Sequence, residues 1–253
     1  MSDDVTANPG GDRFPATRRS VIDAAKSIDA EERAQALERV CEAYWRPVYK
    51  YIRMKWNRPA WDAQDLTQGF FVGLLERDLL AKYDPDKSRL RTYLRACIDN
   101  FIKNEEKAGS RHKRAGAVEH LALDFAGAEQ ELRASTMDPN SLVSPESLEQ
   151  FFEKEWIRSL FTLAVEDLRK KCAEIGRERS FLLFEAYDLE GGDKTSYALL
   201  ALEYGIGVTD VTNALAWART EFRRIALERL RDVCGSKQEF QHEARLIFGW
   251  EAG

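Results

Sequence analysis

The sequence has no apolar run long enough to cross a membrane, and residues 1–19 lack the apolar stretch of a secretory signal. Its cysteines are widely spaced with no CxxC pair, and its three histidines share no metal-ligand spacing with each other or with them. We therefore expect a cytoplasmic protein with reduced, buried thiols, no metal site and no cofactor. No Ser/His/Asp set or phosphate-binding glycine loop is present, so an enzyme is the class that the sequence favours least.

The net charge is also not positive: it is −5, which argues against a general DNA-coating protein. The distribution of charge is more informative than the total. Residues 87–114 carry nine Lys or Arg against three acids, and residues 219–231 carry five against two. Between them, residues 115–146 carry six acids against one arginine. Two basic segments separated by an acidic one indicate an organised binding surface.

Apolar residues recur at helical spacing in most of the chain, and no segment shows the alternation typical of a strand. The sequence therefore predicts an all-α protein with two small helical domains joined by a long acidic linker. We expect the two domains to fold separately. The predicted segments are a flexible tail at 1–19, a first domain at 20–114, the linker at 115–147, a second domain at 148–235 and a helical extension at 236–253.

Three helices are predicted in the first domain. The first begins near Glu31, and Pro47 is expected to kink it or to begin a second helix. Asp62 is expected to cap the next helix, and Ser88 to cap a helix at 89–107. The linker is expected to hold at most one short helix. The C-terminal extension is expected to pack through a face that consists of Phe240, Leu246 and Phe248.

Residues 195–224 read as a helix, a glycine-bearing turn and a second helix, which is the helix-turn-helix plan. Gly205 permits a left-handed turn, and Ala201 is small where two helices cross. Such a motif places the start of its second helix in the DNA major groove. An ordinary helical hairpin is the structural alternative. Thr212 and Asn213 can hydrogen-bond base edges, and Arg219, Arg223 and Arg224 farther along can reach phosphates.

The basic helix at 89–114 offers a second candidate nucleic-acid surface. Cations on its outer face can hold a phosphate backbone, while an aromatic or amide side chain can receive an unstacked base. A solvated helix face is the alternative explanation. The candidates are Arg91, Tyr93, Arg95, Asn100, Lys103, Lys107 and Arg111.

The segment Asp62–Gln68 is acidic at the start of a predicted helix. Acids there suit the helix dipole, and they can also form a patch for a basic protein partner. Thr67 is either an inward-facing residue or a target for an unidentified regulatory kinase. The candidate contact residues are Asp62, Gln64, Asp65 and Gln68.

Together these segments resemble the extracytoplasmic-function sigma factors of bacterial RNA polymerase. The similarity to their region 2 lies in Tyr44-Trp45-Arg46-Pro47-Val48-Tyr49, in 62–71 (DAQDLTQGFF) and in 91–100 (RTYLRACIDN). Residues 195–224 resemble their region 4. The resemblance is greatest to a subgroup with a lengthened linker and a C-terminal extension.

This resemblance implies particular partners and roles. The 62–68 patch would bind the clamp coiled coil of core RNA polymerase, and the second domain would meet the flap. The basic helix would hold the melting promoter, with Asn100 near a flipped base and Arg91 and Arg95 on phosphates. Thr209, Asp210, Thr212, Asn213 and Trp217 would read the distal promoter element. The acidic linker would thread the RNA channel, and an unidentified anti-sigma factor is a further partner class.

Two other functions stay open at this point. A helix-turn-helix regulator could bind duplex DNA without polymerase, although the basic helix and the acidic linker would then be unexplained. A degenerate sigma-like protein could act as an adaptor or sequestering protein, and the weakly basic recognition helix favours it. Co-purification with core polymerase and transcription in a purified system distinguish these possibilities.

Overall fold

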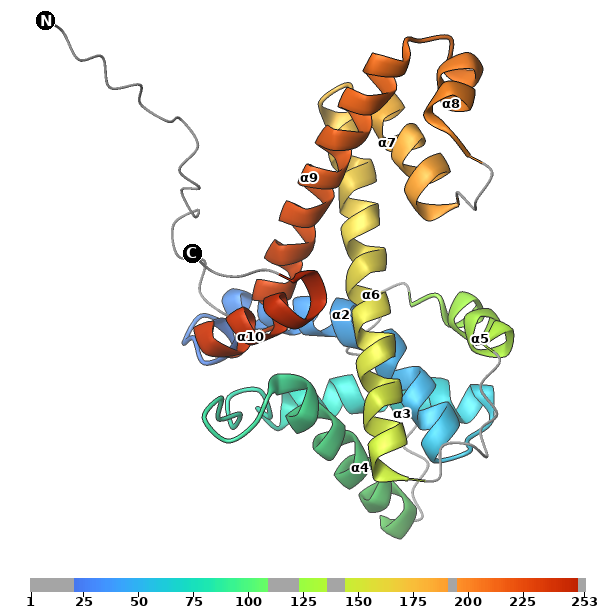
Figure 1. The fold of residues 1–253 in the computed structure, drawn as a ribbon. Helices are drawn as coiled ribbons and strands as arrows, with labels where there is room; N and C mark the ends of the chain where they lie inside the picture. Colours follow the sequence, from blue (N-terminus) through green and yellow to red (C-terminus); the bar gives the residue numbers. More distant parts are fainter. Residues whose placement is uncertain (1–20, 109–122, 136–143, 191–194, 250–253) are drawn as a thin grey trace, which may run out of the picture.

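The computed structural model describes residues 21–108, 123–135, 144–190 and 195–249, and these segments contain helices and no strand (Figure 1). The predicted all-α fold class is therefore confirmed. The elements in chain order are α1 (Val21–Ala25), α2 (Ala30–Lys55), α3 (Ala60–Glu76), α4 (Leu90–Ala108), α5 (Phe125–Ala134), α6 (Pro145–Glu174), α7 (Glu178–Phe184), the π-helical turn η2 (Glu185–Leu189), α8 (Tyr197–Tyr204), α9 (Val208–Asp232) and α10 (Lys237–Phe248).

Helix α2 is the centre of the first core. Asp29 caps it by accepting a hydrogen bond from the Glu31 amide at 2.9 Å. Val40, Tyr44 and Val48 recur every four residues and are almost fully buried. The helix continues through Pro47, so a second helix does not begin there. The same buried stripe extends on both sides of the proline, and this packing outweighs the loss of one backbone donor.

Helix α6 links the two cores because it is long enough to reach both. Its 30 residues span about 45 Å, and it crosses the first bundle before it pairs with α9 (Figure 1). Its first half packs with α2, and its second half packs with α7 and α9. The first core receives Phe152, Trp156 and Leu160, and the second receives Ala164, Leu168 and Cys172.

The C-terminal elements return to the first core. Helix α9 starts in the second core with Val211 and Leu215, and it reaches the first with Leu230. Phe240 and Ala244 of α10 are also buried in the first core. The two cores therefore do not divide the chain at the predicted boundaries of 148 and 236. They share two helices, α6 and α9. Leu246 was expected to pack but is 60% exposed, which corrects that part of the predicted face.

Gly205 makes the turn between α8 and α9. Its φ is +61°, and the Ile206 amide donates to the Ala201 carbonyl at 3.0 Å across the turn. The left-handed turn predicted from this glycine is present.

We expect Gly205→Ala to lower the free energy of unfolding by about 1–2 kcal/mol, because an alanine Cβ is strained at this φ. Gly73→Ala is the matched control: Gly73 lies inside α3, and apart from its chain neighbours and the backbone of its own helix no atom lies within 4 Å of a new Cβ. It should raise stability by about 0.5–1 kcal/mol. Urea unfolding measures both, and equal effects would contradict the assigned backbone role of Gly205.

Candidate nucleic-acid interface

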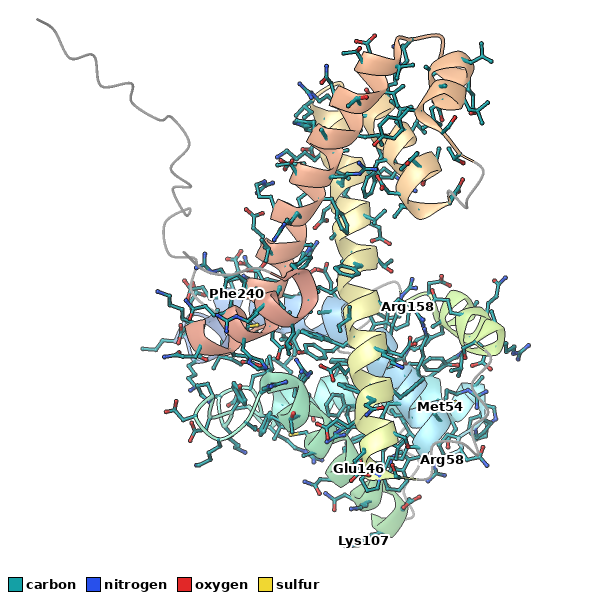
Figure 2. The ribbon with its side chains drawn as sticks, in the orientation of Figure 1. Met54, Arg58, Lys107, Glu146, Arg158 and Phe240 are labelled. Atoms are coloured by element: carbon teal, nitrogen blue, oxygen red, sulfur yellow. The ribbon has the colours of Figure 1, made fainter. Side chains whose placement is uncertain are left out.

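Helix α4 has one face in the core and one in solvent. Leu90, Leu94, Ile98 and Ile102 are fully buried. The exposed side carries Asn100, Lys103 and Lys107. Figure 2 shows Lys107 at the outer end of α4, far from the helix-turn-helix end of the molecule. Three of the predicted contact residues are thus accessible, while Arg111 lies outside the described residues.

Arg91 does not lie on the exposed face. Its two terminal nitrogens contact Glu243 of α10 at 2.6 Å and Glu153 of α6 at 2.8 Å. Its guanidinium also lies over the Trp156 ring at 5.0 Å. The side chain is therefore buried by α6 and α10. The outward placement expected of Arg91 is wrong for this structure, because helices from distant parts of the chain cover that side of α4.

Arg95 and Tyr93 are also engaged. Arg95 contacts Glu149 of α6 at 3.2 Å. The Tyr93 hydroxyl donates to the Leu79 carbonyl at 2.7 Å, and its ring lies 5.3 Å from that of Tyr83. Tyr93 thus fixes the connection between α3 and α4, and its ring is not an open platform for a base. Burial, with a smaller contribution from Cys97, raises the pKa of its hydroxyl above the ordinary value.

The 62–68 patch lies on α3. Asp65 and Gln68 are exposed, while Gln64 and Asp62 are half-buried. Asp62 does not cap the helix, because α3 begins at Ala60 with Pro59 as its N-cap. Instead, the Asp62 carboxylate contacts Arg58 at 3.5 Å. Asp65 and Gln68 are therefore the accessible part of the predicted partner surface.

Thr67 points inward from the same helix. It is fully buried, and its hydroxyl donates to the Ala63 carbonyl at 2.6 Å. Of the two alternatives for this residue, the structure has the inward-facing threonine. A kinase could reach the hydroxyl only if α3 left the core.

The helix-turn-helix presents the start of α9 to solvent. Thr209, Asp210, Thr212 and Asn213 are all exposed there. Asp210 accepts from the Gly207 amide at 3.1 Å, and the Thr212 hydroxyl donates to the Val208 carbonyl at 3.0 Å. The Asn213 amide is therefore the polar group of this face best suited to read a base edge.

Farther along α9, the predicted contact residues have intramolecular partners. Trp217 is half-buried under the Arg177 guanidinium, which lies 4.5 Å from the ring. Arg219 pairs with Asp188 at 2.9 Å, and Arg224 pairs with Glu221 at 2.5 Å. Arg223 is exposed and donates to the Phe248 carbonyl at 3.4 Å. Among the contacts of the described residues, Arg219 and Arg224 have carboxylate partners, whereas the contact of Arg223 is to a backbone carbonyl.

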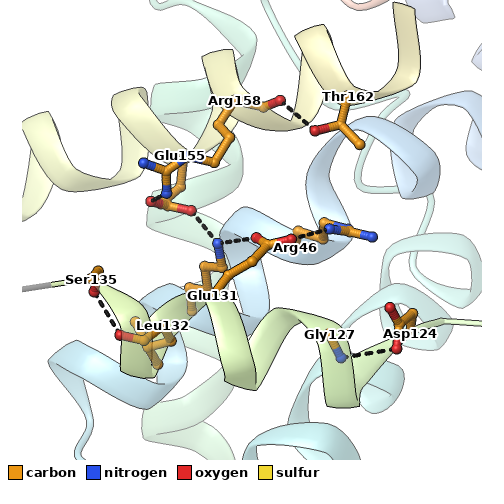
Figure 3. A network of polar contacts seen from close by, with 10 residues as sticks. Arg46, Asp124, Gly127, Glu131, Leu132, Ser135, Glu155, Arg158 and Thr162 are labelled. Carbon is orange, nitrogen blue, oxygen red and sulfur yellow. Dashed lines mark hydrogen bonds and ion pairs between the residues drawn. The ribbon is translucent and has the colours of Figure 1, made fainter. Parts of the chain in front are cut away.

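The acidic segment forms ion pairs with α2 through the short helix α5. Glu129 contacts Arg53 at 2.7 Å and accepts from the Tyr49 hydroxyl at 2.8 Å. The hydrogen bond from Arg53, aided by that from Tyr49, lowers the pKa of Glu129 to about 2. Glu131 contacts Arg46 at 2.6 Å, and Figure 3 shows this pair below Glu155 and Arg158 of α6.

Lys50 joins these acids at the centre of the network. Its side chain is 1% exposed, and its ammonium contacts Glu131 at 2.7 Å and Glu155 at 2.5 Å. Sequence reasoning missed this cluster, because its members come from α2, α5 and α6 and no local pattern marks them as partners. The only available signal was the charge balance between a basic stretch of α2 and the acidic segment.

Neither a metal site nor a membrane span is found in the described segments. They contain no group of three His, Cys, Asp or Glu residues that could hold a metal ion. Among the same residues, no helix combines the length and the apolar character that a membrane crossing requires.

Comparison with known proteins identifies the first domain. Residues 41–112, which begin within α2 and extend past the end of α4, match the family model of sigma-70 region 2. No curated protein and no solved structure matches the chain. The matched segment contains the α3 patch and the basic helix, the two first-domain surfaces described above. This part of the chain is therefore similar to region 2 of the sigma-70 family of sigma factors, and the similarity covers residues 41–112 of the 253.

Proposed function

We propose that this protein binds core RNA polymerase and directs promoter recognition and melting. The observation that carries the proposal is the region 2 match over a helix whose outer side presents Asn100, Lys103 and Lys107. Cations on that side would hold phosphates, and an amide there can hydrogen-bond an extruded base. Extruding a base costs a few kcal/mol, roughly, so several such contacts must act together.

The second half of the proposal concerns the distal promoter element. The start of α9 would enter the major groove with Asn213 toward a base edge and Arg223 toward a phosphate. Thr209 and Thr212 would add hydrogen bonds from the same face. Trp217 and Arg219 are half-buried against other side chains, so their contribution to DNA contact would require them to leave these partners.

Core polymerase would be held through α3 and through the second domain. Asp65 and Gln68 form an exposed polar face that suits a basic helical partner such as the clamp coiled coil. The flap would be met by the second domain, and an anti-sigma factor could compete for either surface. For the acidic linker to thread the RNA channel, α5 would have to leave its arginine and lysine partners on α2.

A second candidate is an adaptor with a degenerate sigma fold. The first two turns of α9 carry Asp210 and no cation, and Arg91 is covered, so promoter affinity in this state would be low. An adaptor would bind polymerase or an anti-sigma factor without starting transcription.

Run-off transcription with core polymerase and a promoter library tests the proposal. We expect specific transcripts, and Asn100→Ala with Lys103→Ala should lower open-complex formation by about tenfold while polymerase binding stays unchanged. Permanganate reactivity of unpaired thymines measures melting, and Lys170→Ala on the exposed side of α6 is the control. Polymerase binding without any transcript would favour the adaptor, and equal loss of binding and melting would contradict the role assigned to α4.

A further inference from the structure

The first turns of α4 are held by carboxylates from outside region 2. Arg91 contacts Glu153 and Glu243, and Arg95 contacts Glu149. We call these three glutamates the acidic clasp. Two of them lie on α6 and one on α10, so both helices must be in place for Arg91 to be enclosed.

A second set of contacts fixes α10 on the start of α4. Glu239 of α10 accepts hydrogen bonds from the Leu90 amide at 2.9 Å, the Gly235 amide at 2.7 Å and the Tyr83 hydroxyl at 3.3 Å. The Leu90 amide is the first backbone donor of α4. An amide at this position has no acceptor inside its own helix. Glu239 thus acts as an N-terminal cap supplied by another element, and it aligns Glu243 one turn later with Arg91.

The clasp occupies the groups that a nucleic acid would need. Guanidinium groups bind carboxylate and phosphate oxygens with the same paired N–H geometry. The Arg91 side chain is 8% exposed, so a phosphate cannot reach it while Glu153 and Glu243 stay in place. The clasp glutamates and a phosphate would therefore compete for the same Arg91 guanidinium.

The clasp is also open to competition at one edge. The side chains of Glu149 and Glu153 are 53% and 35% exposed, whereas that of Glu243 is 1% exposed. Solvent screens the ion pairs of partly exposed carboxylates, so those of Glu149 and Glu153 are weaker than a fully buried pair. A polyanion that approaches from this edge meets Arg95 first, and it can displace the α6 acids before α10 moves.

We propose that the acidic clasp holds the free protein in a closed state, in which α6 and α10 shield the basic start of α4 from nucleic acid. Opening exposes Arg91 and Arg95 for promoter DNA, so this inference rests on the proposed function. The apparent affinity of the free protein for DNA is then its intrinsic affinity reduced by the fraction of open molecules.

Neutralising the exposed half of the clasp tests this state. Glu149→Gln with Glu153→Gln should tighten binding of a forked DNA oligonucleotide to the polymerase-free protein by about tenfold. Loss of two negative charges strengthens DNA binding at any site, so Glu166→Gln with Glu174→Gln is the charge-matched control on the exposed surface of α6. Equal gains in both double variants would overturn the clasp, and circular dichroism checks that both fold.

Cys234 provides a second measurement that needs no change in charge. It is buried in the first core between α9 and α10, and Cys172 is buried in the second core. Burial raises the pKa of both thiols, so each reacts only after local opening. We expect the forked oligonucleotide to speed alkylation of Cys234 by several-fold, as followed by mass spectrometry, and to leave Cys172 unchanged. A Cys234 that stays protected at saturating DNA would overturn the opening step.

Failure of this inference is distinguishable from failure of the proposed function. If the wild-type protein supports run-off transcription but the clasp variants bind DNA no better than the control variant, the protein is a sigma factor without the closed state. If the clasp variants bind DNA more tightly but no variant gives a transcript, the closed state is supported and the sigma function is rejected.

Discussion

Replacing Lys50 by methionine is expected to lower the free energy of unfolding by about 3–5 kcal/mol. The substitution keeps the length of the side chain but removes the ammonium that contacts Glu131 and Glu155. Glu155 is itself 7% exposed, so its carboxylate would remain buried with Arg158 as its remaining cation. Arg158 is 55% exposed, so its ion pair offsets only part of the cost of leaving the Glu155 charge buried, and the expected effect is therefore large.

Urea unfolding followed by circular dichroism measures this effect, and Lys55→Met is the matched control on the same helix. Lys55 contacts Asp99 at 2.7 Å, but both side chains are partly exposed, so its loss should cost less than about 1 kcal/mol. Combining Lys50→Met with Glu155→Met removes both buried charges and should recover most of the stability. If Lys50→Met is no more harmful than Lys55→Met, the cluster does not hold α5 and α6 on α2.

The sequence was sufficient for the helices because their signals are local. Leu90, Leu94 and Ile98 recur at the spacing of one helix face, and Gly205 marks a turn that needs a positive φ. Both features depend only on neighbouring residues. Similarly, the family match lies in region 2, where helix pattern and polar motifs occur together.

The way in which the helices pack against one another could not be predicted from local signals. The apolar stripe of α6 continues from Phe152 to Leu168 without a break, although its packing partners change between these residues. Nothing in the pattern marks that change, so the first half of α6 was assigned to the second domain. Because α6 continues without a break, its first half belongs to the first core and its second half to the second core.

The basic side of α4 was predicted from composition, and composition does not give the direction of a side chain when other elements can cover it. Arg91 and Lys103 belong to the same helix, but the first is enclosed by Glu153 and Glu243 while the second is in solvent. The enclosing acids come from α6 and α10, and charge alone gives no reason to choose them over other glutamates. The contact residues of α4 therefore divide into an accessible half and a covered half, which the sequence alone could not separate.

Reversing charge on the exposed face of α3 is expected to weaken binding to core polymerase by about a hundredfold. The change is Asp65→Lys with Gln68→Lys, which puts two cations where the proposed partner is basic. Asp62 is left intact, because its ion pair with Arg58 contributes to the fold and its loss would mix stability with binding. The backbone of α3 is held by Phe70 and Phe71 in the core, so the double variant should stay folded.

Binding of labelled protein to core polymerase, followed by fluorescence anisotropy at two salt concentrations, measures the loss. Gln35→Lys with Glu38→Lys on α2 is the matched control, since it changes an exposed amide and an exposed acid three residues apart. Its affinity should stay within about twofold of the wild type, because isolated surface charges have small effects. A similar loss in both variants would indicate a general charge effect, and unchanged binding in the α3 variant would remove this face from the polymerase interface. A selective loss places the interface on α3, on residues whose side chains are free to meet a partner without disturbing the buried Thr67 beneath them.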